Sequence, residues 1–265
     1  MKKIAIITGA AGGLGKEIVK SIITDVDELW AIGRNVSKLE ALKAELDSQG
    51  GKIVPLQMDL SDIKSYDILS TKLASEGGAA KDSASEIEIS WLVNNAGAGR
   101  FAPSTDFSTQ ELAGSITTHC TAVAAICNIC IPYMKRGDII MNIASQSAFL
   151  PLTYINLYAS TKAFVYSYTR ALRAELKETG IKVTAVCPGW IKTDLIVDDL
   201  NGKKVNYPFI DNAAHVAKKA VRAARKGKAL SINNFGVRYV TWLQRHMPQE
   251  FSINCWKSMV KKFVE

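Results

Sequence analysis

The stretch KKIAIITGAAGGLGKEIVKSII, residues 2–23, joins an apolar run to a helical pattern through a glycine-rich turn. The isoleucine-rich run at residues 2–8 predicts a buried strand, and helical spacing begins at residue 15. Glycines in such a turn let backbone amides approach an anion closely at a helix N-terminus. The stretch therefore predicts a strand, a phosphate-binding turn and a helix, with a helix-capping loop that binds nothing as the alternative.

Five further apolar runs favour strands that are buried on both faces. They are ELWAIG (28–33), KIVPLQM (52–58), ISWLVN (89–94), DIIMNIA (138–144) and KVTAVC (182–187). Helical patterns separate them at 36–48, 62–75, 109–134 and 158–178, and 75–86 is expected to be a surface loop. This alternation is typical of an α/β fold with one Rossmann-like, doubly wound parallel sheet and helices on both faces. We expect a single domain over residues 1–265, ending in a helical extension.

The composition narrows the class of protein. A hydrophobic content of 48% and a charged content of 22% are ordinary for a soluble globular chain. No run of eighteen or more apolar residues is present, which argues against a membrane-spanning helix. Five cysteines without paired spacing fit a reducing, cytoplasmic setting, and we expect Cys127 and Cys130 to be core residues. Three histidines form no metal-ligand pattern, so no metal is expected.

The net charge of +8 is placed unevenly. Residues 211–265 carry 11 Lys or Arg against 3 Asp or Glu, a net of +8, whereas residues 1–210 carry 22 of each sign. Such a basic segment can contact an anionic membrane, a nucleic acid or an acidic ligand, or can be a solvated helix face. We expect no nucleic-acid partner.

Four short motifs follow one another along the chain. They are Thr8 with Gly9, Gly13 and Gly15, then NNAG (94–97), YASTK (158–162) and PGWIKT (188–193). In order and spacing they resemble the short-chain dehydrogenase/reductase family over residues 8–193. The resemblance implies a nicotinamide cofactor that is bound by Gly9, Gly13, Leu14, Gly15, Arg34, Asp59, Leu60, Asn95, Ala96, Gly97, Tyr158, Lys162, Pro188, Gly189, Ile191 and Thr193.

The tyrosine and lysine of YASTK suit acid–base chemistry. Tyr158 and Lys162 are four residues apart and so share one helix face, where the ammonium is expected to lower the tyrosine pKa. By resemblance, Lys162 also binds the nicotinamide ribose, and a serine thirteen residues before the tyrosine binds the substrate oxygen. That serine is Ser145 rather than Ser147. We therefore expect Ser145, Tyr158 and Lys162 to be catalytic, and Tyr154 to be a pocket wall or loop anchor.

One position departs from the family pattern. Many members have an asparagine thirteen residues before the proline that closes the fourth helix, and here that position is His119. By resemblance the asparagine holds a water in a proton relay. The histidine could hold a water, shuttle the proton itself or be a structural replacement.

The residue after the second predicted strand bears on cofactor choice. It is Arg34, with no acidic neighbour, and a guanidinium suits the 2′-phosphate of NADP(H) better than the free hydroxyls of NAD(H). Asp59 and Leu60 are expected at the adenine, Asn95 and Ala96 along the adenosine.

In related proteins the region after the Pro-Gly motif closes over the substrate, so the resemblance implies that the C-terminal part of this chain determines specificity. Residues 194–210 would be a substrate lid and 211–265 a basic extension. Its aromatic and apolar residues are Trp242, Met247, Phe251, Trp256, Met259 and Phe263. They could line a pocket, pack on the core or another subunit, or rest on an anionic membrane surface.

These features together predict an NADP(H)-dependent oxidoreductase. It would interconvert a ketone and a secondary alcohol on a bulky apolar substrate such as a hydroxysteroid or 3-oxoacyl compound. The alternative is a non-catalytic NADPH-binding sensor or scaffold. Relatives often pair through the helices near 108–134 and 155–178, which implies a homodimer or homotetramer.

Overall fold

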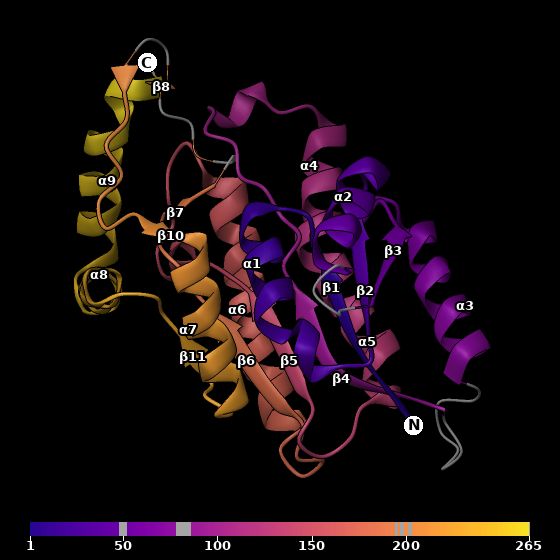
Figure 1. The fold of residues 1–265 in the computed structure, drawn as a ribbon. Helices are drawn as coiled ribbons and strands as arrows, with labels where there is room; N and C mark the ends of the chain where they lie inside the picture. Colours follow the sequence, from indigo (N-terminus) through magenta and orange to yellow (C-terminus); the bar gives the residue numbers. More distant parts are fainter. Residues whose placement is uncertain (48–51, 78–85, 194–195, 197–198, 201–202, 265) are drawn as a thin grey trace.

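Seven parallel strands form the central sheet of the computed structural model, which describes residues 1–47, 52–77, 86–193, 196, 199–200 and 203–264 (Figure 1). The strand order is β11-β6-β5-β4-β1-β2-β3. The strands are β1 (Lys2–Thr8), β2 (Glu28–Gly33), β3 (Ile53–Gln57), β4 (Ile87–Asn94), β5 (Ile139–Ile143), β6 (Lys182–Val186) and β11 (Leu230–Ser231). The doubly wound fold expected from the alternation of strands and helices is confirmed.

Successive side chains of β1 point to opposite faces of the sheet, and each face carries a layer of helices. Ala5 and Ile7 pack with α1 (Gly13–Ile22), α2 (Val36–Asp47) and α7 (Ala213–Arg225). Ile4 and Ile6 share a cluster with α3 (Tyr66–Gly77), α5 (Ala122–Cys130) and α6 (Asn156–Glu175). In Figure 1, α1 and α7 lie side by side in front of the sheet. Burial of both faces explains why β1 to β6 of the central sheet are rich in apolar residues.

The helix expected at 109–134 is interrupted. It consists of α4 (Thr109–Ile116), a π-helical turn (Thr117–Thr121) and α5, followed by a 3-10 turn (Ile131–Tyr133). A π turn adds one residue to the helix and rotates the side chains that follow it. It carries His119 and so fixes where that ring points.

Residues Thr109–Tyr133 are long and apolar enough to cross a membrane, by length and composition. The sequence reading found no candidate because polar residues interrupt the apolar ones. Ile126, Cys127 and Cys130 of this segment are fully buried in the cluster that also contains residues of β4. We therefore assign the segment as a core helix, with Cys127 and Cys130 packing there as expected.

The chain after β6 forms smaller elements at one end of the sheet. The pair β7 (Ile191–Lys192) and β10 (Asp211–Asn212) is parallel, and β8 (Asp199–Leu200) pairs antiparallel with β9 (Lys203–Lys204). Residues 194–195, 197–198 and 201–202 of the expected lid lie outside the described residues. The extension folds into α8 (Phe235–His246) and α9 (Gln249–Val264), at the left edge of Figure 1.

Candidate active site

Ser145 and Tyr158 meet at the carboxyl edge of the sheet. Ser145 lies two residues beyond the end of β5, and its side chain lies close enough to the Tyr158 hydroxyl to act on the pKa of the tyrosine. Its Oγ also accepts a hydrogen bond from the backbone amide of Ser147 at 3.2 Å. The Ser147 hydroxyl is itself buried and has no partner among the described residues. The structure thus joins Ser145 to the tyrosine and gives Ser147 the role of a turn residue.

Lys162 lies one helical turn after Tyr158, on the same side of α6. Its side chain is 4% exposed, and Nζ donates a hydrogen bond to the carbonyl oxygen of Ile143 at 2.8 Å. Nζ is 5.6 Å from the centroid of the Tyr158 ring. Burial lowers the pKa of Lys162 from 10.5 to about 8. The lysine is therefore held at the end of β5 by the backbone rather than by the tyrosine.

The expectation of a lowered tyrosine pKa is wrong for this chain. Burial raises the pKa of Tyr158, and the hydrogen bond from Ser145 only partly opposes that effect. Lys162 does not contribute, because its ammonium points to the Ile143 carbonyl and is weakened by its own desolvation. Tyr158 therefore stays protonated at neutral pH, which is the form that a proton donor needs.

His119 is buried close to Tyr158 and Lys162. Its ring lies edge-on to the ring of Tyr158, with centroids 5.9 Å apart. Nε2 accepts a hydrogen bond from the Ala98 amide at 3.0 Å. Nδ1 lies 3.3 Å from Ser115 Oγ and 3.4 Å from Thr161 Oγ1. Burial lowers the pKa of His119 to about 3, with a smaller contribution from repulsion by the charge of Lys162.

These contacts define the protonation of the histidine ring. An amide can donate only to an unprotonated Nε2, so the single proton of the neutral ring is on Nδ1. Thr161 Oγ1 already donates to the carbonyl oxygen of Tyr158 at 2.9 Å and can accept from Nδ1. Both ring nitrogens therefore have protein partners. Of the three roles considered from the sequence, the structure supports a structural replacement.

The glycine turn after β1 fits a phosphate group. Gly9 has a φ of +63°, and a side-chain carbon on Gly15 would lie 2.1 Å from the Gly9 oxygen. A side-chain carbon on Gly13 would lie 2.7 Å from the Thr193 methyl group. The N-cap of α1 is Gly12, which offers no side-chain hydrogen bond, so the first amides of the helix are left for an anion.

Asn95 holds this turn in place. Its side-chain amide donates to the carbonyl oxygens of Thr8 and Gly9, each at 3.1 Å. Its backbone amide donates to Thr8 Oγ1 at 2.9 Å. Leu14 is buried under the turn, and Ala96 packs on the core cluster beside β4. Asn95 was expected to line the adenosine, but its side chain is used to fix the shape of the turn.

Arg34 is exposed at the end of β2, beside the N-terminus of α2. Lys38, also exposed, has its amide capped by Asn35 Oδ1 at 2.9 Å. Asp59 follows β3 and accepts two hydrogen bonds from Ser61, which lower its pKa. The positive charge of Arg34 lowers that pKa further, and the buried Leu60 comes next. This edge of the sheet thus offers two cations near the place where an adenosine ribose would lie.

The Pro188–Thr193 loop is anchored by residues that the sequence reading missed. The Gly189 amide donates to Asn233 Oδ1 at 3.1 Å, and Asn233 Nδ2 donates to Asp211 Oδ2 at 2.9 Å. A side-chain carbon on Gly189 would lie 2.6 Å from Val237 of α8, so the helix packs directly on this loop. Asn233 lies two residues after β11, at the carboxyl edge of the sheet. This position was the one sequence signal that could have identified Asn233 as a site residue.

Aromatic rings form a wall beside Tyr158. The rings of Tyr207 and Trp190 are in contact, with their centroids 4.8 Å apart. The ring of Phe101 lies between Trp190 and Trp256, at centroid distances of 6.1 Å and 6.5 Å. Phe101, Trp256 and Tyr158 pack against one apolar cluster that includes Leu150, Leu152 and Ile155. The inner face of α9 therefore belongs to the surroundings of the tyrosine, as the pocket alternative for the tail requires. The side chain of Phe263 lies outside the described part of the chain.

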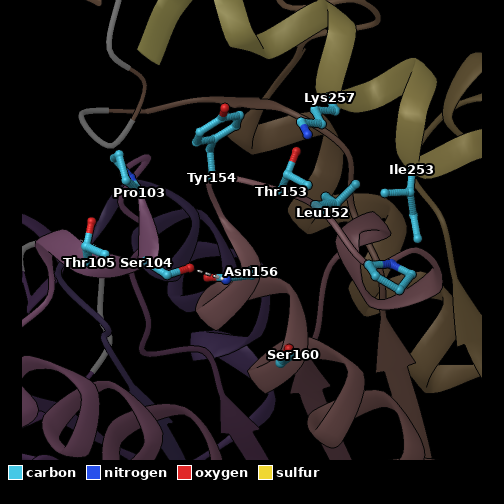
Figure 2. Close-up of a pocket in the computed structure, with 11 residues that line it drawn as sticks. Pro103, Ser104, Thr105, Leu152, Thr153, Tyr154, Asn156, Ser160, Ile253 and Lys257 are labelled. Carbon is cyan, nitrogen blue, oxygen red and sulfur yellow. Dashed lines mark hydrogen bonds between the residues drawn. The ribbon is translucent and has the colours of Figure 1, made fainter. Parts of the chain in front are cut away.

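A separate cavity of about 390 Å³ opens between the 151–156 loop, the 103–105 loop and α9 (Figure 2). Ile253 and Lys257 line it from α9, and Tyr154 from the loop. Asn156 and Ser160 also line it, each two residues from Tyr158 and so about 200° around the helix. The cavity therefore lies behind Tyr158, and Tyr154 is a wall residue of it.

Known proteins resemble this chain in sequence and in fold. The family model for short chain dehydrogenases matches residues 3–203. The very-long-chain 3-oxoacyl-CoA reductase of Pyrenophora tritici-repentis is 31% identical over 190 residues, which are 69% of this chain and 53% of that protein.

Two solved structures superpose on nearly the whole chain. A short-chain dehydrogenase of Sphingobium yanoikuyae in complex with NADPH has a TM-score of 0.74 at 22% identity, covering 99% of this chain and 96% of that one. The bulky-bulky ketone specific alcohol dehydrogenase of Comamonas testosteroni has a TM-score of 0.71 at 20% identity, covering 100% and 95%. At these identities the structures show a shared fold.

Proposed function

Since the chain belongs to the short-chain dehydrogenase family of oxidoreductases, we propose that it is an NADP(H)-dependent enzyme that interconverts a ketone and a secondary alcohol. The observation that carries this proposal is the position of Ser145 next to the Tyr158 hydroxyl at the carboxyl edge of the sheet, with Lys162 one helical turn away. A phenol held by a hydroxyl at the carboxyl edge of the sheet can serve a carbonyl oxygen that lies between them.

The residues divide the work on that oxygen. When bound, the reduced nicotinamide supplies a hydride to the carbonyl carbon. Tyr158 donates its hydroxyl proton to the carbonyl oxygen, which becomes the alcohol, and Ser145 donates a hydrogen bond that orients the same oxygen. Lys162, whose Nζ lies 5.6 Å from the centroid of the Tyr158 ring, would hold the nicotinamide ribose beside the tyrosine. Oxidation of the alcohol reverses these steps.

The choice of NADP(H) is supported by charge at the end of β2. Arg34 and Lys38 are exposed there, and the described residues place no carboxylate at the strand end to receive ribose hydroxyls. Asp59, which follows β3, lies close enough for Arg34 to lower its pKa, and its Oδ1 accepts both hydrogen bonds from Ser61. A structural neighbour from Sphingobium yanoikuyae binds NADPH. These observations favour a cofactor with a 2′-phosphate.

The substrate we propose is bulky and apolar, such as a hydroxysteroid or a 3-oxoacyl compound. Support comes from the aromatic wall of Phe101, Trp190, Tyr207 and Trp256 beside Tyr158. Such rings provide a large apolar contact area. The names of two relatives, a 3-oxoacyl-CoA reductase and a bulky-bulky ketone alcohol dehydrogenase, agree with this class. Residues 194–210 would cover the substrate as a lid.

We place this activity in the cytoplasm, in a homo-oligomer. The five cysteines are free, as a reducing compartment requires. Ile116 and Phe164 are 46% and 42% exposed on α4 and α6, where a second subunit would cover them.

The test is a titration with NADPH and NADH, followed by NADPH oxidation with ketosteroids, 3-oxoacyl compounds and small ketones. We expect tighter NADPH binding and turnover on one bulky class. Tight NADPH binding without turnover on any class would favour the sensor alternative, and equal affinity for the two cofactors would contradict the role of Arg34.

A further inference from the structure

The outer face of α8 carries a continuous stripe of rings. Phe235, Tyr239, Trp242 and His246 follow one another at spacings of four, three and four residues, which places them on one side of the helix. Phe235 is 82% exposed, Tyr239 52% and Trp242 54%. We call these four residues the aromatic stripe. Large aromatic side chains gathered in this way on a surface helix mark a contact site.

Neighbouring rings of the aromatic stripe contact one another along α8. The Tyr239 and Trp242 rings stack with centroids 6.4 Å apart, and Trp242 stacks on His246 at 4.8 Å. Nδ1 of His246 donates a hydrogen bond to the carbonyl oxygen of Trp242 at 2.7 Å. A surface whose rings are already fixed loses little conformational entropy when it binds.

The other face of α8 anchors the helix to the candidate active site. Val237 and Thr241 are buried, and Val237 packs on Gly189 of the Pro-Gly loop. At the start of the helix, the ring of Phe209 covers Gly236, and Asn234 Nδ2 donates to the Phe209 carbonyl oxygen at 3.1 Å. Phe209 is 53% exposed and has a φ of +56°, a conformation that is rare for a bulky residue. The aromatic stripe therefore lies beside the end of the 194–210 segment.

Positive charge accompanies the aromatic stripe. Arg238 is exposed on α8, and the Arg245 guanidinium lies 5.8 Å over the ring of Phe149. Among the described residues, neither arginine has an ion pair with a carboxylate. The whole net charge of +8 belongs to residues 211–265. Of these cations α8 carries Arg238 and Arg245, so an anionic partner would complement the charge beside the aromatic stripe.

We infer that the aromatic stripe and Arg238 dock the protein on an anionic lipid bilayer. Tryptophan and tyrosine prefer the boundary between headgroups and acyl chains, and arginine binds the phosphates of anionic lipids. Protein interfaces are also rich in tyrosine, tryptophan and arginine, so a second copy of the chain is the alternative that the sedimentation measurement below tests. Docking would bring the bilayer next to Phe209 and the Pro-Gly loop, so an apolar substrate could enter from the membrane. The docking itself does not depend on the proposed reaction.

The test is flotation of the full chain with vesicles of phosphatidylcholine, and with vesicles in which part of this lipid is replaced by phosphatidylglycerol. We expect binding to the anionic vesicles that weakens as salt is added. Replacing Tyr239 and Trp242 together by serine should weaken it at least about tenfold. Arg238→Glu should weaken it about fivefold to thirtyfold, because the charge at this position changes by two units, from +1 to −1, near the surface.

Matched controls separate this surface from general effects. Ile63→Ser combined with Ile68→Ser is the control for the Tyr239 and Trp242 variant, because it removes two exposed apolar side chains that are distant in sequence from α8. Lys177→Glu is the control for Arg238→Glu, because it makes the same change of net charge at another exposed position. Neither should alter vesicle binding, and NADPH binding should show that every variant is folded. Absence of vesicle binding by the unaltered chain, or equal losses in the controls, would overturn the proposal. So would sedimentation showing that the Tyr239 and Trp242 variant only breaks an oligomer.

Discussion

The backbone amide of Ala98 donates a hydrogen bond to Nε2 of His119 at 3.0 Å. Ala98 directly follows the NNAG motif, and His119 comes from the π turn between α4 and α5. The bond fixes the loop after β4 against the helix at the point where Lys162 and Tyr158 lie. It also keeps the imidazole neutral, since a protonated Nε2 would face a second donor.

His119 should make the protein sensitive to acid. Its pKa is about 3 when folded and 6.5 when unfolded, so between these values the unfolded chain binds the extra proton. The free energy of unfolding then falls as the pH falls below 6.5, by up to about 1.4 kcal/mol per pH unit from this group. Urea unfolding should show His119→Asn gaining about 2 kcal/mol relative to the parent between pH 8 and pH 5. If the free energies of unfolding of the variant and the parent differ by the same amount at pH 8 and at pH 5, the assignment of a buried, neutral ring is contradicted.

Lys162 should destabilise the fold at neutral pH. Its pKa is 10.5 when unfolded and about 8 when folded, so the native state binds fewer protons between these values, and stability rises with pH across this window. Lys162→Met removes the charged group, so its stability relative to the parent should decline by roughly 3 kcal/mol from pH 7 to pH 10.5. Thermal melting at the two pH values measures this. A parallel pH dependence in both proteins would mean that the lysine is not desolvated.

Arg34 should determine the preference between cofactors. Arg34→Asp replaces a cation that can pair with a phosphate by an anion that repels it and can accept from ribose hydroxyls. We expect NADPH affinity to fall about tenfold to a hundredfold and NADH affinity to hold or rise, measured by fluorescence titration. Lys64→Asp, at an exposed position on another turn, is the matched control. Equal losses for both cofactors would show a general effect on folding.

Asn233 should act as a positioning residue for the Pro-Gly loop. Asn233→Ala removes the acceptor of the Gly189 amide and the donor to Asp211. The loop would then be held less firmly beside the proposed nicotinamide site, so kcat should fall roughly tenfold. The affinity for NADPH should change little, because the substitution leaves Arg34 in place. Thr179→Ala breaks similar local hydrogen bonds at the opposite end of β6 and should leave kcat unchanged. A loss confined to thermal stability would show a purely structural role.

The fold could be predicted from the sequence because its signals are local. Each of the strands β1 to β6 contains a run of β-branched and apolar residues, and the turn after β1 needs glycines at fixed places. The seventh strand, β11, has only two residues, and pairing with β6 rather than a pattern of its own defines it.

The site could be predicted only in part. Spacing along one helix was enough to bring Tyr158 and Lys162 together, and counting indicated Ser145. The direction of the Tyr158 pKa shift depends on burial, which spacing does not show. The links among Gly189, Asn233 and Asp211 span 44 and 22 residues and exist only in the folded chain.

The most direct test of the proposed function is the rate of NADPH oxidation by Tyr158→Phe with whichever bulky ketone the parent protein reduces. Phenylalanine keeps the ring against Gly99 and removes only the hydroxyl that Ser145 holds. We predict that kcat falls by a factor of about a hundred or more, while the Kd for NADPH stays within a few-fold of the parent value. Turnover that survives this substitution would contradict the assignment of Tyr158 as the proton donor.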